Sequence, residues 1–320
     1  MKISDTHGWT PDILGDNYEH ITVHQPDDYD GNVVTTVVRL PSRHPAPTTA
    51  ILYVHGFNDY FFQKEMGERF VREKYGFYAV DLRRYGRSIL PGLEKFKVKD
   101  LTEYFPDLRS AINIMTEDGV KDVVILAHST GGLITSLFME QDPPGEVKAL
   151  MLNSPFLAWN LPPLVRRIGI PAVKLLSRVF PRLRVSPGGT PKYSAAISSR
   201  LDGEWDYSAE WKPDRMPKVA TEWIRAIDEA QREVERGTVK VPVLLMHSDR
   251  SAYPSDPSEL FHRADGVLNV DNIAAAGRRL GPDVTEVTIH DGLHDLLLSS
   301  PKVRDKAYRV IFDWMHEHGL

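Results

Sequence analysis

The chain has 320 residues, of which 42% are hydrophobic and 26% charged, and it contains no cysteine. This composition is that of an ordinary globular protein and excludes a wholly disordered, collagen-like or coiled-coil chain. The lack of cysteine excludes disulfides, thiolate metal sites and a cysteine nucleophile, so any chemistry must use oxygen or nitrogen groups. The net charge of −5 argues against a nucleic-acid partner, which usually requires a basic domain.

The N-terminal residues are polar and contain no apolar stretch of the kind found in signal peptides. No window reaches the ~18 consecutive apolar residues that a membrane span requires. We therefore expect a soluble, cytoplasmic protein, while the sequence leaves its oligomeric state open.

Short apolar runs alternate with longer segments of helical periodicity, which is typical of a parallel sheet covered by helices on both faces. The expected strands are residues 21–24, 33–40, 50–55, 77–81, 123–127, 149–153, 243–247 and 286–290. The expected helices are residues 63–75, 101–117, 131–141, 271–280 and 302–318. Residues 25–32 are turn-rich, so an antiparallel pair should open an otherwise mostly parallel, eight-stranded α/β sheet.

A long segment without strand-like runs separates the sixth and seventh strands, and it far exceeds the usual connection of about 2 to 6 residues. The sequence thus predicts one core domain, residues 1–155 with 239–320, interrupted by a helical cap at residues 156–238. Residues 147–201 contain nine Lys and Arg but no Asp or Glu, so they carry +9 and the rest of the chain −14. Such a segment is either a solvated basic face or a surface that attracts an anionic substrate or makes peripheral contact with lipid.

The fifth strand ends in the run Ala127-His128-Ser129-Thr130-Gly131, and a helix follows. A serine on a strand-to-helix turn, with small residues two positions away on either side, is typical of a nucleophile elbow. Ala127 and Gly131 meet this requirement, so Ser129 is predicted to be a nucleophile rather than a simple helix N-cap. His128 should point to the opposite face and serve in packing.

A serine that attacks an ester or amide needs two backbone N–H groups to stabilise the oxyanion. One should come from Thr130 at the start of the helix, and the other from Phe57 in the loop after the strand at 50–55. The candidates for a substrate pocket are His55, Asn58, Tyr60, Phe156 and Trp159. Aromatic residues in such a pattern also fit an ordinary core.

The general base should follow the last strand, because catalytic groups gather at the carboxyl ends of parallel strands. His294 lies there and is the predicted base. His290 and His294, with Asp291 and Asp295, resemble a metal-ligand spacing, but Gly292 indicates a loop rather than a helix. We therefore expect no metal site.

Two carboxylates compete to orient His294. Asp249 directly follows the strand at 243–247, whereas Asp265 lies 16 residues further on. A helix, a strand and short loops occupy roughly 25 to 30 residues. The 29 residues from Asp265 to His294 fit this length better than the 45 residues from Asp249, so we favour Asp265. Asp249 would then hold its loop through Arg250.

The order nucleophile, acid, histidine resembles the α/β-hydrolase superfamily, above all its branch of monoacylglycerol lipases, lysophospholipases and serine-aminopeptidase-like hydrolases. The segments that carry the resemblance are residues 55–57, 81–88, 128–132, 265–270 and 291–294. The resemblance implies an α/β-hydrolase fold with its cap after the sixth strand. Ala127 and Arg84 depart from it, because each stands where the family usually has glycine.

These residues predict a serine hydrolase that cleaves small carboxylic esters with lipid-like or aromatic acyl groups, through an acyl-enzyme and without a cofactor. Ser129, Asp265 and His294 would form its catalytic triad. An aminopeptidase-like amide hydrolase with the same triad is the alternative, in which Glu204, Asp206 or Glu210 could bind a substrate amine. A non-catalytic binding protein of the same fold is the least expected outcome.

Overall fold

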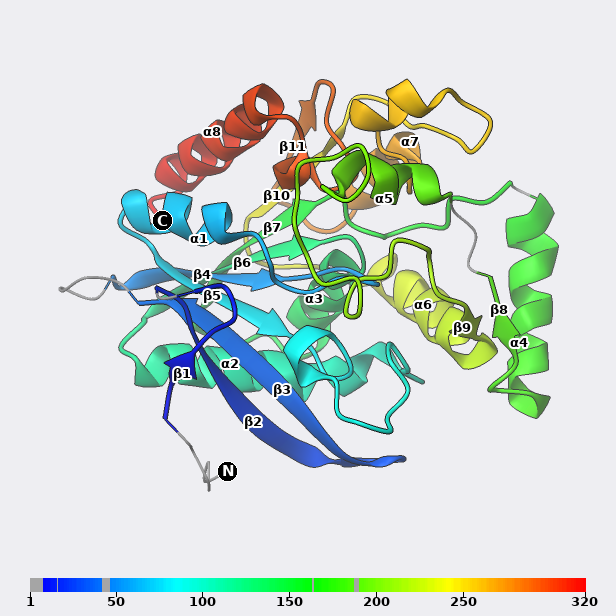
Figure 1. Ribbon diagram of the computed structural model, residues 1–320, viewed down its shortest axis with the longest axis horizontal. Helices are drawn as coiled ribbons and strands as arrows, with labels where there is room; N and C mark the ends of the chain where they lie inside the picture. Colours follow the sequence, from blue (N-terminus) through cyan, green and yellow to red (C-terminus); the bar gives the residue numbers. More distant parts are fainter. Residues whose placement is uncertain (1–7, 16, 42–46, 163, 187–189) are drawn as a thin grey trace.

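A nine-stranded sheet lies at the centre of the computed structural model, which describes residues 8–15, 17–41, 47–162, 164–186 and 190–320 (Figure 1). The strand order is β1-β2-β3-β5-β4-β6-β7-β10-β11. The strands are β1 (Thr10–Pro11), β2 (Glu19–Asp28), β3 (Gly31–Leu40), β4 (Thr49–Val54), β5 (Gly76–Asp81), β6 (Asp122–His128), β7 (Val147–Asn153), β10 (Val243–Ser248) and β11 (Val284–Ile289). Strands β5, β4, β6, β7, β10 and β11 run parallel, whereas β1, β2 and β3 pair antiparallel.

The predicted α/β fold class is confirmed, with all eight expected strands present and a two-residue strand, β1, added at one edge. The opening hairpin differs from the prediction, because most of the residues expected to be its turn lie within β2 and β3. Strand β2 alternates between buried and solvent-facing positions along much of its length. Polar residues therefore suit the outer face of β2. A prediction that follows only runs of apolar residues makes such a strand too short.

Helices cover both faces of the sheet, as expected. Helices α1 (Lys64–Arg72) and α8 (Pro301–Glu317) pack on one face. The other face carries α2 (Phe105–Glu117), α3 (Thr130–Gln141) and α7 (Val270–Gly277), with α6 (Thr221–Val234) packed on α3. The central strands are buried from both sides, which explains their unbroken apolar runs.

Residues 156–238 lie beyond the carboxyl ends of the parallel strands. They contain one π-helical turn (Val165–Gly169) that continues into α4 (Ile170–Val179), then α5 (Pro191–Ile197) and α6. Between these helices, β8 (Arg184–Val185) pairs with β9 (Val219–Ala220), a short pair that the sequence did not indicate. Helix α6 packs on α3, and α4 lies outside α6 at the periphery of the molecule (Figure 1). Within the described residues, we find no helix that is both long and apolar enough to cross a membrane.

Arg84 occupies a left-handed backbone conformation with φ of 67°, which explains why glycine would suit its position. Its buried guanidinium donates to Asp28 Oδ2 at 2.6 Å and to Asp30 Oδ2 at 3.1 Å. These ion pairs offset the backbone strain and fasten the loop after β5 to the β2–β3 hairpin.

Candidate active site

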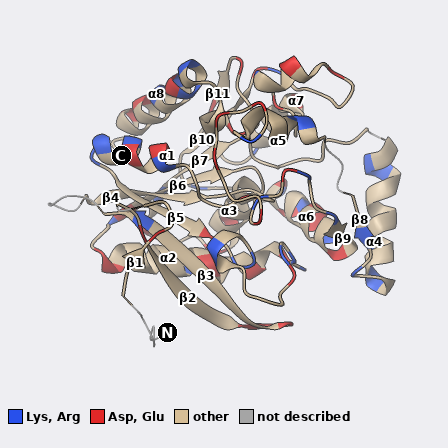
Figure 2. Ribbon diagram, in the orientation of Figure 1, with Lys and Arg blue, Asp and Glu red and all other residues tan. Residues whose placement is uncertain are grey.

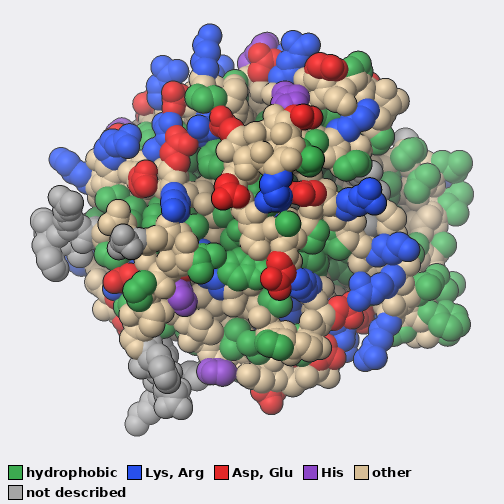
Figure 3. All heavy atoms as spheres, in the orientation of Figure 1, with side chains coloured by type: hydrophobic (Ala, Val, Ile, Leu, Met, Phe, Trp, Pro, Cys, Tyr) green, Lys and Arg blue, Asp and Glu red, His purple; other side chains and the backbone are tan. Residues whose placement is uncertain are grey.

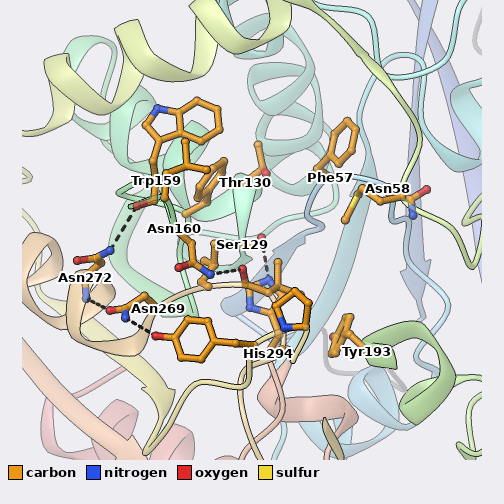
Figure 4. A pocket seen from close by; sticks show the side chains of 18 of the residues that line it. Phe57, Asn58, Ser129, Thr130, Trp159, Asn160, Tyr193, Asn269, Asn272 and His294 are labelled. Atoms are coloured by element: carbon orange, nitrogen blue, oxygen red, sulfur yellow. Dashed lines mark hydrogen bonds between the residues drawn. The ribbon is translucent and has the colours of Figure 1, made fainter. Parts of the chain in front are cut away.

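A pocket with a volume of about 1000 Å³ opens between the carboxyl ends of the parallel strands and residues 156–238 (Figure 4). Ser129 and His294 lie at its base. Aromatic side chains from both parts of the chain line its walls, among them Phe57, Phe156, Trp159, Tyr193 and Trp223. The pocket is therefore largely apolar, with a few convergent polar groups, as is usual for a site that binds a small molecule.

Ser129 sits on the sharp turn between β6 and α3, with φ of 52° and ψ of −118°. This conformation costs conformational free energy for a residue other than glycine, and such strain is typical of functional sites. Two neighbouring glycines make the turn sterically feasible. A Cβ atom on Gly131 would collide with the carbonyl oxygen of His55, and one on Gly56 would lie 2.9 Å from the Ser129 Cβ.

The three predicted triad residues lie in one hydrogen-bonded chain. The Ser129 hydroxyl is 3.0 Å from His294 Nε2, and His294 Nδ1 is 2.9 Å from Asp265 Oδ2. The other oxygen of Asp265 accepts from the backbone N–H groups of Val267 and Leu268, at 2.8 and 2.7 Å. Asp265 is fully buried, so its carboxylate is held in a single orientation toward the imidazole.

Asp249, the competing carboxylate, lies away from His294. It pairs with Arg250, and its Oδ1 accepts from the backbone N–H of Asp291 at 2.9 Å. Although partial burial opposes the shift, the hydrogen bond from Arg250 lowers the pKa of Asp249. Its role in the structure is thus to tie the loop after β10 to the loop after β11.

Phe57 lies in the loop after β4, Thr130 is the first residue of α3, and both line the pocket together with Ser129. Within the described parts of the chain, we find no hydrogen-bond partner for either N–H. Both groups are therefore free to donate to an oxygen atom placed beside the serine, where the N-terminus of α3 also favours negative charge.

Three of the five predicted substrate-contacting residues line the pocket, namely Asn58, Phe156 and Trp159. The other two lie elsewhere. His55 donates through Nδ1 to the carbonyl of Gly56 and accepts the N–H of Leu82 through Nε2, so both ring nitrogens shape the loop after β4. Tyr60 accepts the N–H of Ser208 and packs beside the pocket wall rather than in it.

His128 is buried next to Ser129 and donates through Nδ1 to the carbonyl of Asn153. Burial lowers the pKa of His128, so the ring is neutral near pH 7. Its ring centroid lies 4.8 Å from that of His294. It therefore packs against the imidazole of His294, as the expected packing role implies, but it also lines the pocket beside Ser129, so the expectation that it points to the opposite face is wrong.

The sequence reasoning missed a polar network that joins the cap segment to the loop after β4. Lys212 Nζ donates to Asp59 Oδ1 at 2.9 Å, and Asn58 Nδ2 donates to the carbonyl of Pro213 at 2.9 Å. Lys212 and Asp59 are both buried and both line the pocket. The two residues are 153 positions apart, so no pattern of neighbouring residues could have predicted that they pair.

A further group, Asp59, His128 and Asp295, could in principle hold a metal ion, since its ligand atoms lie within 4.8 Å of one another. The protein already satisfies these carboxylates. Lys212 neutralises Asp59, while Asp295 accepts from the side-chain amides of Asn153 and Gln63. A cation would have to displace the lysine ammonium, so the donor set fits a metal poorly. His290 pairs with Asp249 and Asp291, away from His294.

The strand order, the serine on a strained turn and the imidazole after the last strand define an α/β hydrolase. The chain belongs to the Hydrolase_4 family, described as Serine aminopeptidase, S33, whose model matches residues 45–300. It is also 27% identical over 106 residues to Epoxide hydrolase 1 from Caenorhabditis elegans. That match covers 33% of this chain and only 25% of the relative.

Solved structures share the fold over nearly the whole chain. A soluble variant of monoglyceride lipase from Saccharomyces cerevisiae is 18% identical, with a TM-score of 0.64 and coverage of 92% of this chain and 96% of that one. Monoacylglycerol lipase from Paleococcus ferrophilus is 19% identical, with a TM-score of 0.60 and coverage of 94% and 99%. Est1E from Butyrivibrio proteoclasticus, with ferulic acid bound, is 17% identical, with a TM-score of 0.55 and coverage of 94% and 96%.

Proposed function

We propose that this α/β hydrolase cleaves carboxylic esters through an acyl-enzyme on Ser129. The observation that carries the proposal is the continuous chain of contacts from the Ser129 hydroxyl through His294 to the buried Asp265, at the base of an apolar pocket. A serine is a weak nucleophile by itself, and a histidine within hydrogen-bond distance, oriented by a carboxylate, is the arrangement that activates it.

In the proposed reaction, His294 Nε2 takes the proton of Ser129 as Oγ attacks the ester carbonyl carbon. Asp265 keeps the proton of the imidazole on Nδ1 and stabilises the imidazolium that forms. The N–H groups of Phe57 and Thr130 donate to the oxyanion. His294 then gives its proton to the departing alcohol, and a water molecule repeats the cycle on the acyl-enzyme to release the acid.

We further propose that residues 156–238 act as a cap that shapes an acyl pocket. This segment supplies Phe156, Trp159 and Trp223 to the lining. Such walls suit a small ester with a lipid-like or aromatic acyl group. The two lipases and the ferulic acid-bound Est1E among the similar structures support this substrate class.

Aminopeptidase-like amide hydrolysis is disfavoured by the charge of the pocket. A substrate amine would need an acidic partner, yet Glu204, Asp206 and Glu210 lie outside the lining, and Glu204 pairs with Arg304. Asp59 does line the pocket, but Lys212 neutralises it. The other charged lining residues are Arg166 and Arg167, together with Arg232, which pairs with Asp228.

Hydrolysis assays separate the two reactions. With p-nitrophenyl esters of graded chain length and aminoacyl p-nitroanilides at equal concentration, we expect kcat/KM to be higher for the esters, because the cationic pocket repels the free amine of the anilides. N-acylated anilides serve as the control, since they keep the amide but remove the charge. A clear preference for the free aminoacyl anilides would contradict the proposal.

Replacing Lys212 by methionine should lower kcat for a soluble ester by about 10- to 100-fold, with a smaller change in KM. Without the ammonium, Asp59 is left buried and unpaired, and the adjacent loop that carries the Phe57 N–H shifts; loss of one complete oxyanion donor costs about 10²- to 10³-fold. Lys212→Arg should recover part of the rate. Lys95→Met is the matched control, because half-buried Lys95 donates to the carbonyl of Glu210 and, within the described residues, to no other group. Equal kcat for Lys212→Met and Lys95→Met would rule out this positioning role.

A further inference from the structure

The outer side of α4 and the segments on either side of it expose an unusual number of large apolar side chains. Of the twelve large hydrophobic residues exposed in the described chain, seven lie between residues 164 and 183. They are Leu164, Val165, Ile168, Leu175, Val179, Phe180 and Leu183, with exposed fractions between 46% and 69%. We call these seven residues the α4 apolar face. Figure 3 shows them as a green margin along one edge of the molecule.

The inner side of α4 packs against α6, whereas no described residue covers the α4 apolar face. Ile170 and Ser177 are buried toward α6, and Lys174 reaches Asp228 of α6 at 2.9 Å. Leu175 and Val179 lie one helical turn apart on the outer side and are 64% and 68% exposed. Packing of the fold therefore does not account for them, and exposed clusters of this kind usually mark an interaction site.

Unpaired arginines border the α4 apolar face. Four of the nine cations in residues 147–201 pair with acidic residues, and Lys192 bonds to backbone carbonyls. The remaining four, all exposed, have no ion-pair partner in the part of the chain that the structure describes: Arg166, Arg167, Arg178 and Arg182. Lys and Arg positions mark the ribbon of α4 (Figure 2), and basic side chains lie close to the apolar margin in the space-filling view (Figure 3). The combination is an apolar strip with a cationic border.

We infer that the α4 apolar face docks the enzyme onto a membrane surface rich in anionic phospholipids. Leucine, isoleucine, valine and phenylalanine side chains would enter the boundary between headgroups and acyl chains, and the four arginines would contact phosphates. A second copy of the chain is a poorer occupant, because a two-fold contact would bring the same arginines of both copies together without acidic residues in this segment to neutralise them.

The docking face is continuous with the mouth of the pocket. Arg166, Arg167 and Pro171 belong to the same helical segment as the α4 apolar face and also line the pocket. A docked molecule would thus present its pocket mouth close to the lipid, where an ester could enter without crossing bulk water. This consequence rests on the proposed function, whereas docking itself does not require Ser129.

Sedimentation with sonicated vesicles tests the inference. We expect the protein to bind vesicles of phosphatidylcholine with 30% phosphatidylglycerol at least tenfold more tightly than vesicles of phosphatidylcholine alone, with the preference lost at high salt. Leu175→Ser with Val179→Ser should reduce binding to anionic vesicles about tenfold or more. Arg178→Gln with Arg182→Gln should reduce mainly the preference for anionic lipid.

Ile13→Ser is the matched control, because Ile13 is equally exposed, at 65%, but lies outside the α4 apolar face. Hydrolysis of a soluble short-chain ester should be the same in all these variants. Ser129→Ala should still bind vesicles, so failure of the catalytic proposal and failure of this one are distinguishable. Two binding results would overturn the inference: the wild-type protein shows no preference for anionic vesicles, or the Leu175/Val179 variant binds them as tightly as the Ile13 variant. A dimer in analytical ultracentrifugation that the Leu175 and Val179 substitutions convert to monomer would also overturn it.

Discussion

Replacing Ser129 by alanine should lower kcat for ester hydrolysis by about 10⁴-fold or more, because the reaction loses its nucleophile while the oxyanion donors and the pocket remain. The substitution removes only the hydroxyl that contacts His294 Nε2. The fold should be preserved, since alanine keeps the same Cβ and meets the same backbone conformation. Rates with a p-nitrophenyl ester, followed together with circular dichroism, measure both effects.

Ser154→Ala is the matched control for this experiment. Ser154 follows β7, is buried, also has a positive φ of 48°, and its hydroxyl has no hydrogen-bond partner among the described residues. Its loss should leave kcat within about twofold of the wild type, because a hydroxyl without a partner contributes little. A fluorophosphonate probe should label the wild-type protein and the Ser154 variant but not the Ser129 variant. An adduct that survives Ser129→Ala would refute the assignment of the nucleophile.

Replacing Asp265 by asparagine should lower kcat by about 10⁴-fold, whereas Asp249→Asn should change it by less than about tenfold. An amide at position 265 would still accept the N–H groups of Val267 and Leu268 through its oxygen. Its NH₂ group would then face His294 Nδ1 as a donor and favour the tautomer with its proton on Nε2. That imidazole has no lone pair available for the proton of Ser129.

Asp249→Asn serves as the internal comparison, because the sequence alone offered both carboxylates for this role. It weakens the pairing with Arg250 and the acceptor for the N–H of Asp291, so we expect lower stability of the loops after β10 and β11 rather than loss of chemistry. Thermal unfolding and kcat measured on the same preparations separate the two effects. A larger fall in kcat for Asp249→Asn than for Asp265→Asn would reverse the assignment of the acid.

The central sheet was predictable because its strands and helices leave patterns of apolar residues among near neighbours in the sequence. The parallel strands are buried on both faces, so each reads as an apolar run, and the helices between them carry a one-sided apolar pattern. Strand β2 was underestimated because its solvent-facing positions are polar. The β8–β9 pair, with two residues in each strand, is too short to produce any pattern.

The candidate site residues likewise divide into those that local sequence predicts and those that it does not. Ser129 stands out because a strained turn demands small neighbours that are close in sequence, and His294 because it follows the last strand. The residues that line the pocket were less predictable, since aromatic side chains serve cores and pockets alike. Asn58, Phe156 and Trp159 face the pocket, whereas His55 and Tyr60 support the loops behind it.

The sequence by itself determined the α/β hydrolase fold, the order of the candidate triad residues along the chain, and a basic segment without a single acidic residue. Each of these features depends on neighbours along the chain, through steric demands, periodicity or composition. Only the tertiary structure decided which carboxylate meets His294, that Lys212 neutralises Asp59 across 153 residues, and which arginines of the basic segment remain unpaired. These outcomes depend on distances between residues far apart in sequence, and such distances exist only once the chain has packed.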